Sequence, residues 1–326
     1  MALMETLTLT GTDLKVSRAC FGTMTFGSQT DQAGAQCIVD TCIDHGVNFF
    51  DTANVYNKGV SETILGKALH GRRDRVVLAS KVRMKMGDAP NESGLSRAAI
   101  RKAIDESLAR LGTDYVDLYY LHAPDRSVPI EETLATIDEL VRAGKVRYPA
   151  ISNFPSWQVV QMFWIAKEKG YRPPTVSQLM YNVLARAIEE EYVAMCKQFG
   201  VSTVVYNPLA GGLLTGKQRR EGPLPGTRFD NNQLYLGRYW HAAYFDALDE
   251  LSAAAAKAGR SLVDVALCWL LYHSAADCLI FGATRQEHLE QNLAPFDNGK
   301  PLSPELLAVC DAAWAKVRGV APAYHR

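Results

Sequence analysis

Four side chains that can transfer or stabilise a proton stand at or just beyond the ends of short apolar segments. Asp51 ends the segment GVNFFD, and Tyr56 follows in the next few residues. Lys81 ends VVLASK, and His122 ends VDLYYLH. An ammonium beside a phenol favours the phenolate, so we expect Lys81 to lower the pKa of Tyr56 by about 2–3 units from its ordinary value near 10. Asp51 would keep Lys81 charged and fixed, and the His122 imidazole would orient the proton acceptor or relay a proton.

Each of these residues also has an ordinary structural interpretation. Taken singly, Asp51 could cap a loop and Tyr56 could be half-buried packing. Lys81 could be a solvated strand end, and His122 could be a hydrogen-bonded core histidine. A catalytic metal is a sharper alternative, but the sequence contains no HxH, HExxH or paired-cysteine pattern. The cysteines are scattered, mostly in apolar segments, and we expect them to be reduced core residues. They are Cys20, Cys37, Cys42, Cys196, Cys268, Cys278 and Cys310.

Strand-like segments alternate with helical patterns along nearly the whole chain. Each segment is short and apolar, as a strand buried on both faces should be. The segments are Ala19–Phe21, Asn48–Asp51, Val76–Lys81, Val116–Leu121, Val146–Ser152, Thr175–Gln178, Thr203–Tyr206 and Cys278–Phe281. This alternation requires parallel strands with right-handed crossovers, and a length of 326 residues favours a closed (β/α)8 TIM barrel over an open doubly wound sheet. Active sites of such barrels lie at the C-terminal ends of the strands, so Asp51, Lys81 and His122 should meet there.

Signals at the ends of the elements agree with this assignment. Residues 5–16 alternate between polar and apolar, which indicates a short N-terminal β-hairpin. Ser96 is a candidate N-cap, and Gly112 is a candidate C-terminal stop for the helix that follows it. The polar stretch 217–232 is typical of a long loop on the C-terminal face, and we expect the next helix to begin near Arg238.

Composition excludes several classes of partner. Lysine plus arginine and aspartate plus glutamate number 35 each, so no global field attracts nucleic acid or an anionic membrane. The first residues lack the basic and apolar regions of a signal peptide, and no stretch approaches about 18 consecutive apolar residues. We therefore expect a cytoplasmic protein that binds neither nucleic acid nor membrane. No linker divides the chain, so we expect one domain over residues 1–326.

The sequence resembles the aldo-keto reductase family over nearly its whole length. GVNFFDTANVY matches the family signature around its aspartate and tyrosine, and the remaining matches are YLHAPD, SQLMYN, YNPLAGGLLTGK, GRYW, HLEQN and AYHR. These motifs are similar to the branch of aflatoxin-aldehyde and succinic-semialdehyde reductases. The resemblance implies reduction of a small-molecule carbonyl substrate with NADPH/NADP+. The catalytic residues that it implies are Asp51, Tyr56, Lys81 and His122.

The resemblance also implies how the nicotinamide end of NADPH is held. GxGxxG is absent, so we do not expect a Rossmann pyrophosphate loop. Ser152, Asn153 and Gln178 would bind the carboxamide, and Tyr206 would stack on the ring. The expected cofactor-binding residues are Gly22, Thr23, Met24, Asp51, Ser152, Asn153, Gln178, Tyr206, Asn207, Pro208, Leu209, Gly211, Gly212, Lys217, Arg228, Gly282, Thr284, Arg285, His288, Gln291 and Asn292.

The same resemblance implies how the phosphate and adenine end of NADPH is held. Gly211 and Gly212 would let the backbone approach the pyrophosphate, with Lys217 as a charge partner. GATRQEHLEQN opens a helix, and Thr284 and Arg285 at its start would hold the 2′-phosphate, which favours NADPH over NADH. The last residues of this motif, Gln291 and Asn292, would bind adenine. His288 departs from the branch, which usually has glutamine there, so its adenine contact is in doubt.

The expected substrate-binding residues are Tyr56, His122, Tyr235, Arg238 and Arg326. In the resembling branch, residues matching the last three hold a carboxylate, which points to a short aldehyde with an acid group, such as a semialdehyde, or to a dicarbonyl. The alternative is that both arginines are solvated surface charges. The family also includes potassium-channel β-subunits, so a regulatory NADPH-binding module is the second hypothesis. The resemblance suggests a homodimer, whose interface the apolar pattern does not locate.

Overall fold

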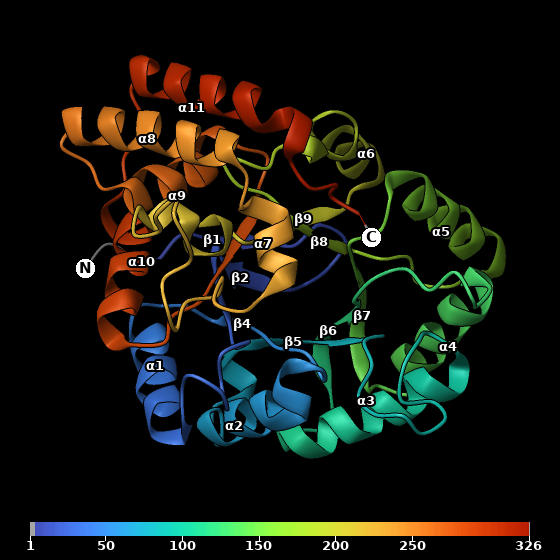
Figure 1. Cartoon of the computed structure of the whole chain (residues 1–326). Helices are drawn as coiled ribbons and strands as arrows, with labels where there is room; N and C mark the ends of the chain where they lie inside the picture. Colours follow the sequence, from blue (N-terminus) through green and yellow to red (C-terminus); the bar gives the residue numbers. More distant parts are fainter. Residues whose placement is uncertain (1–3, 326) are drawn as a thin grey trace.

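The protein folds around a closed barrel of eight parallel strands (Figure 1). The computed structural model describes residues 4–325. Neighbouring strands follow one another around the barrel in the order β10, β3, β4, β5, β6, β7, β8, β9. Their bounds are β3 (Ala19–Gly22), β4 (Phe49–Asp51), β5 (Val77–Val82), β6 (Val116–Leu121), β7 (Val146–Ser152), β8 (Val176–Met180), β9 (Ser202–Tyr206) and β10 (Cys278–Phe281). These strands coincide with the apolar segments of the sequence to within about two residues, which confirms the (β/α)8 barrel.

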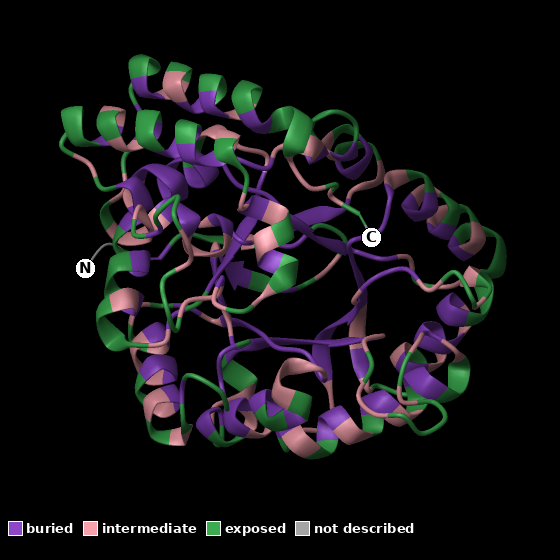
Figure 2. Ribbon diagram, viewed as in Figure 1, coloured by how far each residue is buried: buried purple, intermediate pink, exposed green. Residues whose placement is uncertain are grey.

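Helices surround the barrel, and most of them have a buried face and an exposed face (Figure 2), whereas α9 (Leu262–His273) is buried along nearly its whole length. Two such faces are expected when apolar residues recur along one stripe of a helix. The helices are α1 (Gln32–Asp44), α2 (Val60–Ala68), α3 (Arg97–Leu111), α4 (Ile130–Arg142), α5 (Ser156–Lys169), α6 (Tyr192–Phe199), α7 (Gln233–Tyr239), α8 (Ala242–Lys257), α9 (Leu262–His273), α10 (Gln286–Asn298) and α11 (Pro304–Val317). Helices α8 and α11 pack side by side at one edge (Figure 1).

The helix ends agree with the sequence signals except after the long loop. The Ser96 hydroxyl accepts a hydrogen bond from the Ala99 amide at the start of α3, and Gly112 ends that helix with φ +64°. Helix α7 begins at Gln233 rather than near Arg238. The Asn232 side chain caps it, and a helix this short has too few turns to display a recognisable apolar stripe.

A two-stranded hairpin lies against the N-terminal end of the barrel. It consists of β1 (Thr6–Thr8) and β2 (Lys15–Ser17), which pair antiparallel as expected. Leu9, Leu14 and Val16 pack in one cluster with apolar side chains of the barrel interior. The hairpin therefore closes this end of the barrel from water.

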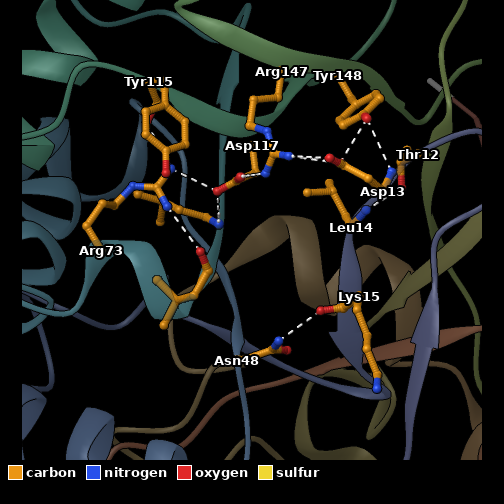
Figure 3. A network of polar contacts seen from close by, with 12 residues as sticks. Thr12, Asp13, Leu14, Lys15, Asn48, Arg73, Tyr115, Asp117, Arg147 and Tyr148 are labelled. Atoms are coloured by element: carbon orange, nitrogen blue, oxygen red, sulfur yellow. Dashed lines mark hydrogen bonds and ion pairs between the residues drawn. The ribbon is translucent and has the colours of Figure 1, made fainter.

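Ion pairs and hydrogen bonds connect the hairpin turn to the barrel (Figure 3). Asp117, near the start of β6, is 1% exposed. It binds Arg73 at 2.8 Å and Arg147 at 2.7 Å. Arg147 also binds Asp13 in the hairpin turn at 2.8 Å, and the Tyr148 hydroxyl donates to the same carboxylate at 2.9 Å. In barrels of this kind the N-terminal end serves stability and the active site lies at the C-terminal end, so the candidate site belongs at the end opposite this network.

Two further expectations concern cysteines and membranes. Six of the cysteines are buried free thiols, and Cys37 on α1 is exposed, contrary to the expectation that it belongs to the core. Its position faces outward from the apolar stripe of α1. Among residues 4–325, no helix combines the length and apolarity needed to cross a bilayer.

Candidate active site

A buried ion pair stands at the C-terminal ends of two neighbouring strands. Asp51 is the last residue of β4, and Lys81 lies near the end of β5. The Lys81 ammonium contacts the Asp51 carboxylate, and the two side chains are 0% and 3% exposed. Lys81 Nζ also donates to the Thr52 carbonyl at 2.7 Å and to the Tyr56 hydroxyl at 3.3 Å. The cation therefore has a fixed position beside the phenol.

His122 completes the cluster from the next strand. It follows β6 directly, and its ring meets the half-buried Tyr56 ring edge to face, with centroids 6.0 Å apart. The Asn153 side-chain amide donates to the His122 carbonyl at 2.9 Å. The structure thus brings together Asp51, Tyr56, Lys81 and His122, the four residues that the sequence singled out.

The direction of the Tyr56 pKa corrects one expectation. Burial raises the pKa of the Tyr56 phenol, and the Lys81 ammonium opposes that rise without cancelling it. The expected lowering is therefore wrong, because burial disfavours the phenolate more than the cation favours it, and strand spacing says nothing about burial. The phenol consequently keeps its proton at neutral pH while lying beside a cation.

Burial and the partner's charge act in opposite directions on the pKa of each member of the ion pair. Burial acts to lower the pKa of Lys81, but the Asp51 carboxylate and the Tyr56 phenol together outweigh it and leave this pKa above its usual value. Burial raises the pKa of Asp51, against the effects of Lys81 and of a hydrogen bond from Gln178. Gln178 Nε2 donates to the second carboxylate oxygen at 2.8 Å. Sequence reasoning gave Gln178 a cofactor role only and missed this bond to Asp51.

Residues expected near the nicotinamide gather at the ends of β7, β8 and β9. Asn153 has φ +61°, and its amide also donates to the Ser152 hydroxyl at 2.9 Å. The Tyr206 hydroxyl donates to the side-chain oxygen Oδ1 of Asn153 at 2.7 Å. The Asn153 backbone amide donates to the Gln178 carbonyl at 3.3 Å, and the Gln178 side chain donates to Asp51, so Gln178 joins this group to the buried ion pair. Polar groups from three strands, one of them linked through the backbone, therefore form one connected rim.

The loop after β9 turns sharply through several left-handed residues. Asn207, Ala210, Gly211 and Gly212 all have positive φ, and a Cβ built on Gly212 would meet no atom within 4 Å. Backbone at Gly212 is thus open to close approach by a ligand. Further along, Pro208 is buried, Leu209 is half-buried and Lys217 is exposed, with no ion pair to Lys217 among the described residues.

The remaining cofactor candidates flank β3 and α10. Gly22 ends β3 and lies against β10, and the next two residues are the buried Thr23 and the partly exposed Met24. Gly282 follows β10, and its carbonyl accepts a hydrogen bond from Asn292 on α10 at 3.1 Å. The other candidate cofactor-binding residues of this region are exposed or half-buried. They are Thr284, Arg285, His288 and Gln291.

Two arginines converge on one tyrosine above the barrel. The guanidinium carbons of Arg228 and Arg238 each lie 5.4 Å from the centre of the Tyr235 ring. The same ring packs against Gly211, where a Cβ would approach it to 2.7 Å. The loop expected to meet pyrophosphate therefore touches the residues expected to meet substrate. Arg326, the third expected substrate residue, lies outside the described residues.

The C-terminal tail is held near this rim as far as it is described. The Tyr324 hydroxyl accepts from the Ser156 amide at 3.4 Å and donates to Glu191. Its ring stacks edge to face on Tyr192, with centroids 5.1 Å apart. Ser156 begins α5, three residues after Asn153, so the tail ends close to the C-terminal face of the barrel. Nowhere in residues 4–325 do three or more His, Cys, Asp or Glu side chains form a cluster suited to a metal ion.

Comparison with known proteins agrees with the resemblance in the sequence. Residues 18–315 match the Aldo/keto reductase family. Human aflatoxin B1 aldehyde reductase member 2 is 36% identical over 94% of this chain and 88% of its own length. Human aldo-keto reductase family 7 member A3 is 35% identical over 94% and 96%. A probable voltage-gated potassium channel subunit beta of Arabidopsis thaliana is 34% identical over 90% and 92%. The chain belongs to the aldo/keto reductase family.

Proposed function

We propose that this protein is an NADPH-dependent reductase of aldehydes and ketones in which Tyr56 donates the proton. The observation that carries the proposal is the phenol of Tyr56 beside the buried Lys81–Asp51 pair, with Lys81 Nζ 3.3 Å from the phenol oxygen. A protonated phenol next to a fixed cation is an acid whose conjugate base is already stabilised. The similarity to aflatoxin aldehyde reductases supports the carbonyl as the group reduced.

In this proposal each residue has one task. Tyr56 gives its hydroxyl proton to the carbonyl oxygen as negative charge develops there. Lys81 stabilises the phenolate that remains, and Asp51 keeps Lys81 charged. His122, edge to face with the Tyr56 ring, positions the carbonyl oxygen. NADPH, when bound, supplies the hydride to the carbonyl carbon. General acid catalysis of this kind contributes roughly 10²- to 10⁴-fold in rate.

The residues at the mouth of the barrel fit a nicotinamide cofactor. Ser152, Asn153 and Gln178 would bind the carboxamide, and Tyr206 would lie against the ring. The open backbone at Gly212 suits a pyrophosphate, because no side chain stands in the way. These assignments follow the family likeness, and the connected polar rim supports them.

The adenosine phosphate would lie at the start of α10. Arg285 is exposed at the N-cap position of that helix, and its side chain does not cap the helix. The guanidinium is thus available for a 2′-phosphate, beside the free amides of the first turn. We propose NADPH rather than NADH on this ground. Thr284 and Lys217 are the neighbouring candidates for phosphate contacts.

The proposed substrates are short aldehydes that carry an acid group, such as semialdehydes, and dicarbonyls. The supporting observation is the pair of guanidinium groups on Tyr235, neither of which has an ion-pair partner among the described residues. A planar carboxylate would relieve the repulsion between two such cations. Arg238 would bind the substrate carboxylate directly, and Arg228, expected to contact the cofactor, would contribute its positive charge from the cofactor side of the same ring.

A regulatory NADPH-binding module is the second candidate, favoured by the similarity to a potassium channel β-subunit. A steady-state screen distinguishes the two. NADPH and NADH oxidation would be followed with succinic semialdehyde, an α-dicarbonyl, an aromatic aldehyde and a bulky ketone. We expect turnover with NADPH and the highest kcat/KM for the acid-bearing aldehyde. Tight NADPH binding without turnover on any of them would favour the module, and no NADPH binding would refute both candidates.

A further inference from the structure

The turn that carries Tyr56 has an unusual backbone. Tyr56 opens a 3-10 turn over Tyr56–Gly59, and the three residues after it have φ of +49°, +53° and +90°. Two of these, Asn57 and Lys58, carry a Cβ that disfavours this region. A conformation of this kind persists only where surrounding contacts impose it. The position of the Tyr56 phenol therefore depends on what anchors this turn.

One anchor lies on the side of β3. The Asn57 side-chain amide donates to the Phe26 carbonyl at 2.6 Å and to the Met24 carbonyl at 3.2 Å. These bonds tie the turn to the loop after β3. They do not reach β5, the strand that carries Lys81. The chain before Tyr56 is bonded to β5 through the Asn54 amide, which donates to the Lys81 carbonyl at 3.3 Å. The turn and helix after Tyr56 are held relative to β5 by a separate contact.

Glu62, in the first turn of α2, provides a contact to that strand. Its side chain is fully buried. The Ser80 hydroxyl donates to Glu62 Oε1 at 2.5 Å, and Arg110 Nε on α3 donates to Glu62 Oε2 at 2.7 Å. Ser80 directly precedes Lys81 in β5, so its side chain points out toward α2 while that of Lys81 points into the barrel. One carboxylate thus joins the helix after Tyr56 to the neighbour of Lys81.

Arg110 also reaches the turn itself. The Cβ that an L-residue would have at Gly59 would approach Arg110 Cδ and Nε to 2.7 Å, so the arginine side chain lies against the Gly59 backbone. Gly59 needs both its positive φ and the absence of a side chain. A buried carboxylate that has lost its cation is costly, so Glu62 and Arg110 hold one another in place.

We propose that Glu62 is a positioning residue for the reaction, holding Tyr56 at its working distance from Lys81 through Ser80 and Arg110. The inference rests on the proposed function for its effect on turnover. It predicts that weakening the hydrogen bonds of Glu62 moves the Tyr56 phenol away from the Lys81 ammonium. Because a displacement of about 1 Å at a reacting group can lower the rate by about 10²-fold, kcat is the sensitive quantity.

The test compares Glu62→Gln with Glu139→Gln, a matched change that removes an exposed pair to Arg97 on the outer face of α4 and α3. We expect Glu62→Gln to lower kcat by about 10- to 100-fold while the NADPH Kd stays within about twofold of the parent protein. Glu139→Gln should leave both unchanged. Ser80→Ala removes only the link to β5 and should lower kcat in the same direction, which keeps the test usable if Glu62→Gln does not fold.

A second readout does not require turnover. Tyrosine labelled at its ζ carbon reports by NMR on the hydrogen bond and charge near the phenol, and Tyr56→Phe identifies the Tyr56 signal. We expect this signal to move in Ser80→Ala and Glu62→Gln but not in Glu139→Gln. An unmoved signal, or a kcat equal to that of the Glu139→Gln control, would overturn the inference. A moved signal in a protein that reduces no carbonyl would support it while refuting the proposed function.

Discussion

Replacing Lys81 with Met should make the stability of the protein depend on pH in a specific way. Methionine is unbranched and keeps most of the length of the lysine stem, but it removes the cation from Asp51, which is 3% exposed. Of the polar contacts of that carboxylate, the bond from Gln178 at 2.8 Å would remain. Breaking a buried pair by removing one partner costs about 3–5 kcal/mol. We expect a loss near the lower end of this range, about 3 kcal/mol, because Gln178 still compensates one oxygen.

The sign of the pH dependence follows from the Asp51 pKa. Burial already raises that pKa, and Lys81 opposes the rise, so removing Lys81 must raise it further. Between the unfolded pKa near 3.9 and the higher folded pKa, the native state binds more protons than the unfolded state. The variant should therefore lose stability as pH rises through this window, by at most about 1.4 kcal/mol per pH unit for one proton.

Urea unfolding followed by tryptophan fluorescence at about pH 5 and about pH 8 measures this effect. The free energy of unfolding of Lys81→Met should be nearer to that of the parent protein at the lower pH. The double variant Lys81→Met with Asp51→Asn has no charge to bury, so it should recover much of the stability at the higher pH. An equal loss at both pH values, or a double variant no more stable than the single one, would refute the reasoning about the buried pair.

Three further predictions concern activity. Tyr56→Phe should lower kcat by at least about 10²-fold with NADPH affinity nearly unchanged, measured by steady-state kinetics and fluorescence titration; a near-normal kcat would exclude Tyr56 as proton donor. Arg285→Ala should weaken NADPH binding by about 1–3 kcal/mol and hardly affect NADH, whereas equal losses by titration would move the 2′-phosphate site toward Lys217. Deleting Arg326 should reduce kcat/KM for succinic semialdehyde by roughly 10- to 100-fold but spare an uncharged aromatic aldehyde, and equal effects would remove the case for acid-bearing substrates.

The sequence predicted two kinds of feature correctly. They are elements with a regular apolar pattern and residues at strand ends whose place in the fold is fixed by topology. The apolar run Cys278–Phe281 has the same bounds in the sequence and in the structure because a strand buried on both faces reads as a continuous apolar run. The proximity of Asp51, Lys81 and His122 could be predicted from the sequence alone, because parallel strands place their C-terminal ends at one rim of the barrel.

The features that sequence missed depend on contacts between distant residues. Arg110 meets Glu62 across 48 positions of the chain, and neither residue has a local pattern that marks it. Nothing in the local sequence marks Ser80, because its role depends on the hydrogen bond that its outward side chain donates to the Glu62 carboxylate of α2. The pKa of Tyr56 belongs to the same class, since burial is a property of packing and is not encoded in spacing.

The opposing effects on Tyr56 suit the task proposed for it. A proton donor must keep its proton at neutral pH and release it when charge develops on the acceptor. Burial provides the first requirement by raising the phenol pKa, and Lys81 at 3.3 Å provides the second, because the phenolate forms beside a cation that is already in place. A lowering large enough to ionise the phenol at rest would leave no proton to give. Asp51 and Gln178 therefore matter less for making Tyr56 acidic than for keeping the cation fixed until the proton moves.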